Sequence, residues 1–241
     1  MTSSDKQART RTVVWASLGA AALLGAAAFG AVTVLPAFGH GGHADAGSGS
    51  GSGSGSAAAA QPAIAAADLA SWTNQAHSIG TTSSLATAAQ QHCTDALGTD
   101  VGSGTDSHLD ARGEVASLVY RHGTDAYYCL STADHLGMWD LIDDSVPAGN
   151  TVPADGILVD TAGSHGGTGS LVGYAVGFAG PDVTAVSITP VGGAATTATL
   201  EDGTWTAWWP TDAADDSDAT VTITTRDGAT HSVVESDAFI R

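Results

Sequence analysis

The stretch DGTWTAWWP (Asp202–Pro210) places three tryptophans directly behind a tight-turn dipeptide. Glycine after aspartate accepts the positive φ that a primed hairpin turn requires, so a strand is predicted at Thr204–Trp209. In that strand Trp205 and Trp209 share one face and Trp208 points to the other. Because large aromatic side chains stabilise a fold by burial, at least one face is predicted to be core. The other face is a candidate binding surface for a sugar or a partner protein, with core packing alone as the alternative.

Short strands with regular turns are predicted on both sides of this stretch. Thr220–Thr224 alternates between polar and apolar residues, which indicates one wet face and one buried face, and Asp227-Gly228 is a second tight-turn dipeptide. A hairpin is predicted around His122-Gly123-Thr124. The remaining predicted strands are Glu114–Arg121, Asp125–Ser131, Gly156–Asp160, Ser170–Phe178, Val183–Thr189, Ala195–Leu200, Thr220–Arg226 and Thr230–Val234.

Residues 62–98 are predicted to be helical, because apolar residues recur there at three- and four-residue spacing. Gly80 is expected to divide the segment, Ser83 or Ser84 to cap the second helix, and Gly98 to end it. The glycine-rich residues 98–107 are predicted to form a loop. The fold class is therefore α+β, with one or two helices packed on a mainly antiparallel β-sandwich or small barrel.

A membrane anchor is predicted near the N-terminus. Residues 13–35 contain no charge, and about 20 apolar residues suffice for a spanning helix. Basic residues in the tail, residues 1–12, place this tail in the cytoplasm by the positive-inside rule. The Gly/Ser/Ala-rich residues 36–61 predict a flexible linker, and residues 62–241 an extracytoplasmic domain with a β-rich part from residue 113. The alternative is a signal peptide cleaved near Gly39, which would make the protein secreted.

Charge restricts the class of partner. The chain of 241 residues has a net charge of −18, and residues 1–12 contribute +2, so the remainder carries −20. A surface this acidic argues against nucleic acid and other polyanions, and it permits cationic or basic partners.

Cys93 and Cys129 both follow the predicted span and predict a disulfide in an oxidising compartment, with two free thiols as the alternative.

Two blocks, GFAGPDVTAV (Gly177–Val186) and Asp202–Pro210, carry a resemblance. They resemble the C-terminal β-module of uncharacterised exported or membrane-anchored proteins of high-GC Gram-positive bacteria, which similarly place a cysteine in an upstream strand, as Cys129 is here. The resemblance implies an envelope location and a β-rich fold, and it carries no assigned chemistry. Some of these proteins look like outer parts of anti-sigma factors, but a tail of twelve residues is too short for a sigma-binding domain.

Sites for metal or catalysis are predicted only weakly. Asp212, Asp215, Asp216 and Asp218 could supply oxygen ligands to calcium, although the run lacks the glycine and glutamate of an EF-hand loop. Asp160, Ser164 and His165 have the residue types of a hydrolase triad, but no nucleophile-elbow motif surrounds the serine. His122, His135, His165 and His231 are scattered through the domain without metal-ligand spacing.

These observations predict a single-pass, non-catalytic binding or interaction module at the cell envelope, without a cofactor. Its predicted partner is a cell-wall component or another exported protein. The alternative is an envelope hydrolase, or another enzyme, whose site is assembled from distant histidines and aspartates.

Overall fold

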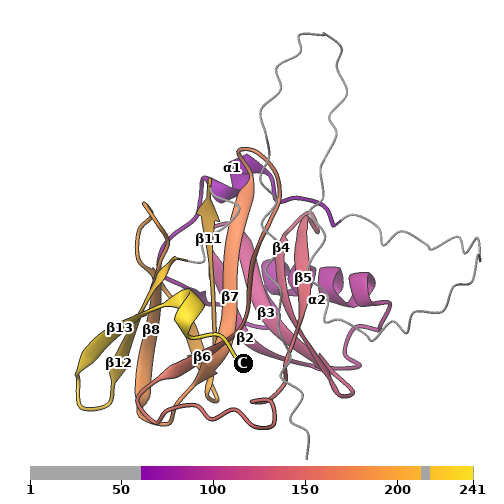
Figure 1. Ribbon diagram of the computed structural model, residues 1–241. Coiled ribbons are helices and arrows are strands. Elements are labelled where there is room, and N and C mark those ends of the chain that lie inside the picture. Colours follow the sequence, from indigo (N-terminus) through magenta and orange to yellow (C-terminus); the bar gives the residue numbers. More distant parts are fainter. Residues whose placement is uncertain (1–60, 213–217, 241) are drawn as a thin grey trace, which may run out of the picture. The chain divides into compact units, whose positions relative to one another are not determined.

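The computed structural model describes residues 61–212 and 218–240, and these residues form three mainly antiparallel sheets with few helices (Figure 1). The predicted tail, span and most of the linker precede the described residues. In the described part of the chain, no helix has the length and apolar character needed to cross a membrane.

Sheet A is formed from consecutive strands, whereas sheets B and C take pairs of strands alternately from the rest of the chain. Sheet A contains, in spatial order, β1 (His77–Ser78), β2 (Thr105–Arg112), β3 (Val115–His122), β4 (Asp125–Thr132) and β5 (Gly137–Ile142). Sheet B contains β10 (Thr199–Glu201), β11 (Thr204–Thr211), β7 (Leu171–Ala179) and β6 (Ile157–His165). Sheet C contains β13 (Thr230–Val234), β12 (Thr220–Thr225), β8 (Val183–Thr189) and β9 (Thr196–Thr197). A β-rich fold is thus confirmed.

Sheet B is the middle layer, with apolar cores on both of its faces. One core joins β7 and β11 to β8 and β12 of sheet C, and it contains Trp205 and Trp209. The other core joins β7 and β11 to β3, β4 and β5 of sheet A, and it contains Trp208. The predicted division of the three indoles between opposite faces is confirmed. Since both faces of sheet B are buried, β7 (LVGYAVGFA) is apolar along its whole length instead of alternating.

Two glycines of β7 make room for two of these tryptophans. Trp205 pairs with Gly177 and Trp209 with Gly173 across the β11–β7 ladder. A Cβ added to Gly173 would lie 2.6 Å from Trp209 Nε1, and one added to Gly177 would lie 2.9 Å from Trp205 Cζ2. The absent side chains therefore create the space that the indole rings fill, and the four-residue spacing is the same in both strands.

The outer face of sheet A is covered by helix α2 (Ser84–Leu97), which Figure 1 shows beside β4 and β5. The Ser83 side chain accepts a hydrogen bond from the Ala86 amide, and Gly98 ends the helix in the left-handed conformation at φ 66°, so both predicted caps are confirmed. Cys93 of α2 and Cys129 of β4 form the predicted disulfide. Both cysteines are fully buried, so the bond ties the helix to the sheet from inside the core.

The segment before α2 corrects the predicted helix over residues 62–98. Only α1 (Ala66–Leu69) is helical there, and His77 and Ser78 form β1 against β2. Ile64 and Leu69 are buried against sheet A and β7, and Trp72 packs on the same core, so the apolar spacing reflects contacts of an irregular segment with the core. The predicted loop of residues 98–107 also gives way to β2 from Thr105 onward.

A buried polar cluster joins sheet A to β9 and β10. Arg112 is fully buried and donates through Nη1 to the Asn74 carbonyl at 3.1 Å and through Nη2 to the Thr197 carbonyl. Asp110, 2% exposed, accepts from Ser117 Oγ at 2.9 Å and from Thr199 Oγ1. Because buried charges stabilise only when they are paired and hydrogen-bonded, this cluster fixes how β2 meets β9 and β10.

Candidate binding surface

The three tryptophans of β11 do not form a binding surface. Trp205 and Trp208 are fully buried and Trp209 is 2% exposed, so all three indoles belong to the two cores of sheet B. The expectation of an exposed aromatic face at these residues is therefore corrected. The physical reason is that sheet A covers the face of β11 that a two-sheet sandwich would leave open to solvent.

An aromatic surface is present instead on the outer face of sheet A, next to α2. Tyr127 of β4 and Trp139 of β5 are half-buried and pack at the margin of the disulfide core, and Leu141 is 43% exposed. Leu141 pairs with Tyr127, and Trp139 pairs with Cys129, so all of these side chains share one face of the sheet. We call Tyr127, Trp139 and Leu141 the aromatic platform.

The rings of the platform are held against each other and against hydrogen-bonding groups. Tyr127 and Trp139 lie edge to face, with centroids 5.9 Å apart and an interplanar angle of 77°. The Tyr127 hydroxyl donates to Asp125 Oδ2 at 3.4 Å, and burial, followed by the Asp125 charge, raises the pKa of Tyr127. His122 pairs with Asp125 across the hairpin. An apolar patch with two rings set edge to face thus includes a phenol and borders the Asp125 carboxylate and the His122 imidazole, which suits a ligand with both apolar faces and hydroxyl groups.

The edge of β5 beside the platform is closed to strand addition. Amides on this edge donate to oxygens other than the carbonyls of a neighbouring strand: Gly137 to the Pro62 carbonyl (3.0 Å), Trp139 to Gln61 Oε1 (2.9 Å), Leu141 to Asp140 Oδ1 (2.9 Å) and Asp143 to Asp160 Oδ2 (2.8 Å). Occupied edge amides prevent pairing with another chain, which is how natural sheets avoid edge-to-edge aggregation.

Three carboxylates meet where β5 lies near β6. Asp160 is the extra residue of a bulge, because pairing with β7 shifts between Val159 and Thr161. Burial, together with the neighbouring carboxylates of Asp143 and Asp140, raises the pKa of Asp160 to about 7. Asp140 in turn accepts from the Tyr174 hydroxyl at 2.6 Å. A raised carboxyl pKa is a signature of functional sites, but here the oxygens accept hydrogen bonds that hold β5 to β6 and β7.

The predicted triad residues of β6 are placed in different surroundings. Asp160 Oδ2 accepts from the Asp143 amide at 2.8 Å, while His165 Nε2 lies 3.4 Å from the Pro62 carbonyl oxygen. Burial lowers the pKa of His165. The Asp160 carboxylate therefore accepts a backbone amide beside the edge of β5, and the His165 imidazole contacts the segment that leads into the domain.

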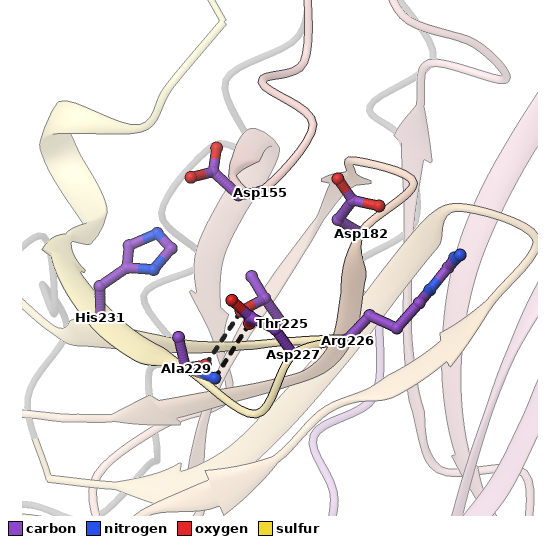
Figure 2. Close-up of a pocket in the computed structure, with 7 residues that line it drawn as sticks. All are labelled: Asp155, Asp182, Thr225, Arg226, Asp227, Ala229 and His231. Carbon is purple, nitrogen blue, oxygen red and sulfur yellow. Dashed lines mark hydrogen bonds between the residues drawn. The ribbon is translucent and has the colours of Figure 1, made fainter.

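A surface pocket of about 480 Å³ lies among three turns (Figure 2). Asp155 precedes β6, Asp182 lies in the β7–β8 turn, and Asp227, with His231 nearby on β13, lies at the β12–β13 hairpin. Asp227 accepts from Thr225 Oγ1 at 2.6 Å and from the Ala229 amide at 3.1 Å, and these bonds lower the pKa of Asp227. That carboxylate is occupied in stabilising its own turn. The lining also includes Arg226, so three carboxylates and one guanidinium surround the pocket.

The candidate metal ligands give no ion site in the part of the chain that the structure describes. No group of three or more histidine, cysteine, aspartate or glutamate residues within 61–212 and 218–240 is arranged to hold a metal. Asp212 and Asp218 are described, whereas Asp215 and Asp216 fall outside the described residues, so the predicted calcium loop stays a prediction. The dispersed histidines likewise lie in separate places: His122 stacks on Tyr120 and His231 lines the pocket.

The fold and its surface define a class of molecule: a disulfide-bonded domain of three layered β-sheets that carries an aromatic platform. No protein-family model, curated protein or solved structure matches the chain.

Proposed function

We propose that this chain is a membrane-tethered, extracytoplasmic binding module whose aromatic platform binds a neutral glycan of the cell wall. The observation that carries the proposal is the platform itself: two touching aromatic rings and an exposed leucine, on a rigid sheet, bordered by hydroxyl and carboxylate oxygens. Pyranose rings have apolar C–H faces that stack on aromatic side chains and hydroxyl edges that hydrogen-bond to such a rim.

The buried disulfide and the sequence before the domain support an envelope location. A disulfide between two fully buried cysteines is typical of proteins that fold in an oxidising compartment. The uncharged residues 13–35 provide a membrane anchor in this proposal, and the Gly/Ser linker allows the domain to stand away from the bilayer. The proposal includes retention of the anchor; removal of the segment near Gly39 would produce a secreted form of the same module.

The net charge of the chain restricts the class of ligand that the platform can bind. A net charge of −18 repels anionic wall polymers, so the ligand of the platform is a neutral polysaccharide strand. Truncating a tryptophan at the centre of a binding surface typically costs about 2 kcal/mol, which is roughly a 30-fold loss of affinity. Trp139→Ala should therefore nearly abolish binding, and Leu141→Ser should weaken it.

The test is sedimentation of the soluble domain, residues 61–241, with purified cell wall stripped of anionic polymers. The wild-type domain should pellet with the wall, and Trp139→Ala should stay in the supernatant. Val191→Ala is the matched control, because it truncates an apolar side chain that is 67% exposed elsewhere on the surface. Thermal melting of each variant separates loss of binding from loss of folding. Equal retention of wild type and Trp139→Ala, or retention of neither, would overturn the glycan proposal.

A second candidate function is supported by the acidic pocket of Figure 2. Three carboxylates from separate turns outnumber the single Arg226 guanidinium around a hollow large enough for a small side chain or an amine. Such a rim suits a basic segment of another exported protein. Cross-linking of the domain to exported proteins, compared between wild type and Asp182→Asn, would test this candidate: unchanged cross-links in the variant would exclude the pocket.

A further inference from the structure

The segment that leads into the domain contacts the platform at the edge of β5, through the backbone of Trp139. Gln61 Nε2 donates to the Trp139 carbonyl at 3.0 Å, and Gln61 Oε1 accepts from the Trp139 amide at 2.9 Å. One side-chain amide thus makes both of the hydrogen bonds that a neighbouring strand would make. Pro62 accepts from the Gly137 amide at 3.0 Å and lies 3.4 Å from His165 Nε2. We call Gln61 and Pro62 the strap.

The strap is the first described part of the chain, and it is fixed to the fold on its C-terminal side. Ile64 is 1% exposed and packs in the core between sheets A and B, only two residues after Pro62. Sixty residues precede the strap, including the predicted span and linker. Gln61 connects those residues to the described domain along the chain, and its side chain bonds directly to Trp139.

We propose that the strap couples the tether to the order of the aromatic platform through Trp139. This inference rests on the proposed function for its ligand and on the proposed anchor for its source of tension. When the strap is closed, Gln61 holds both the amide and the carbonyl of Trp139 while the strand around it is paired with β4, so the indole keeps its edge-to-face contact with Tyr127. When the strap opens, the edge of β5 loses the bonds to Gln61 and Pro62, and the indole loses its fixed backbone.

Coupling of this kind works in both directions. A ligand that needs an ordered platform binds better when the strap is closed, and by linkage its binding must also hold the strap closed. Leu141 and Asp143 keep their own bonds to Asp140 and Asp160, so opening is confined to the part of β5 that the strap covers. The device therefore changes the platform without unfolding sheet A.

The experiment compares full-length wild type, Gln61→Ala and Gln91→Ala in detergent micelles. Gln91 is a matched control, since its side-chain amide bonds to Asp95 Oδ1 at 2.6 Å on the surface of α2. Amide hydrogen exchange is measured at Trp139 and Leu141, and fluorine NMR of 5-fluorotryptophan reports on the Trp139 ring. In Gln61→Ala, exchange at Trp139 should accelerate about tenfold, the Trp139 resonance should shift and broaden, and Leu141 should be unchanged.

Each result supports or overturns the proposed coupling between the strap and the platform. Unchanged exchange at Trp139 would show that the strap does not hold β5, and faster exchange with an unchanged ring resonance would show that it does not reach the platform. Wall affinity of the same variants is the second arm: Gln61→Ala should bind several-fold more weakly than Gln91→Ala. If the wild type does not bind wall at all, the proposed ligand fails while exchange and ring resonance still decide the strap. Should Gln61→Ala fold poorly, Gln61→Glu keeps the acceptor for the Trp139 amide and should give a smaller acceleration.

Discussion

Asp160→Asn is expected to stabilise the domain at alkaline pH and to remove part of its pH dependence. In the folded domain, burial and the carboxylates of Asp143 and Asp140 raise the pKa of Asp160 to about 7, whereas an unfolded aspartate titrates near its ordinary value of about 3.9. The folded state therefore binds the proton more tightly than the unfolded state. Its contribution to stability is fully present below about pH 4 and is lost as the pH rises through about 7.

The magnitude follows from the difference between these pKa values. A difference of about three units corresponds to about 4 kcal/mol between acid and alkaline pH. Because the side chain is only partly buried and shares its charge effects with Asp143, screening by solvent reduces the expected effect to about 1–2 kcal/mol. Asparagine keeps an acceptor for the Asp143 amide and has no charge to bury, so it avoids the alkaline loss.

The assay is urea unfolding of residues 61–241 at several pH values between 4 and 8. The variant should be more stable than wild type at pH 8 and about equal to it at pH 4. Asp100→Asn is a suitable control, because Asp100 is an exposed carboxylate in a loop. A difference between wild type and Asp160→Asn that stays constant with pH, or a variant that is less stable at pH 8, would refute the reasoning.

Three further predictions concern the core and the helix. Gly177→Ala should destabilise the domain by about 1–3 kcal/mol in urea unfolding, because its Cβ would collide with Trp205 and the backbone of β6. Burial lowers the pKa of His92, so the folded state resists its protonation; His92→Gln should reduce the loss of stability below about pH 6.5, measured as melting temperature against pH. Replacing Cys93 and Cys129 by alanine should lower the unfolding free energy by about 3–4 kcal/mol, measured against the oxidised wild type.

Local patterns in the sequence were sufficient for several elements of the fold. The strands Val183–Thr189 and Thr230–Val234 have the predicted bounds, and Asp202-Gly203 turns with φ of 49° and 77°, as a primed hairpin turn requires. Ser83 and Gly98 delimit α2 because capping depends on a few neighbouring residues. Turns and helix caps can be predicted from the sequence because each depends on a few neighbouring residues.

Other features depend on contacts between distant segments and escaped prediction. Strand β5 (GMWDLI) carries Met138, Asp140 and Ile142 on the face toward sheet B, so an aspartate interrupts the expected apolar face. That aspartate is stabilised by Tyr174, a residue more than thirty positions away. The alternation that marks β5 as a strand can be recognised only if Tyr174 is known to be the partner of Asp140. The platform residue Trp139 lies in this strand, so its place on the surface could not be predicted from the alternation of apolar residues.

The matched spacing of Gly173 and Gly177 with Trp209 and Trp205 was available in the sequence, although its meaning required the register of β7 against β11. An antiparallel pair reverses direction, so the first tryptophan meets the second glycine, as observed. Glycine in the interior of a strand normally weakens it. Here each glycine accommodates an indole from the neighbouring strand, and the large apolar area of that ring compensates for the missing side chain.

The distribution of acidic groups separates structural carboxylates from those that face a ligand. Asp140 and Asp160 accept backbone amides along β5, Asp110 is buried with Arg112, and Asp227 closes its own turn. Much of the acidic character that first suggested cation binding is therefore engaged in hydrogen bonds within the fold. Asp125 differs, because it is exposed and its side chain accepts from Thr124 at the hairpin and from Tyr127 of the platform. A carboxylate that remains accessible beside two aromatic rings is better suited to orienting a hydroxyl-bearing ligand than to holding a metal ion, and this directs the first binding experiments to polysaccharides.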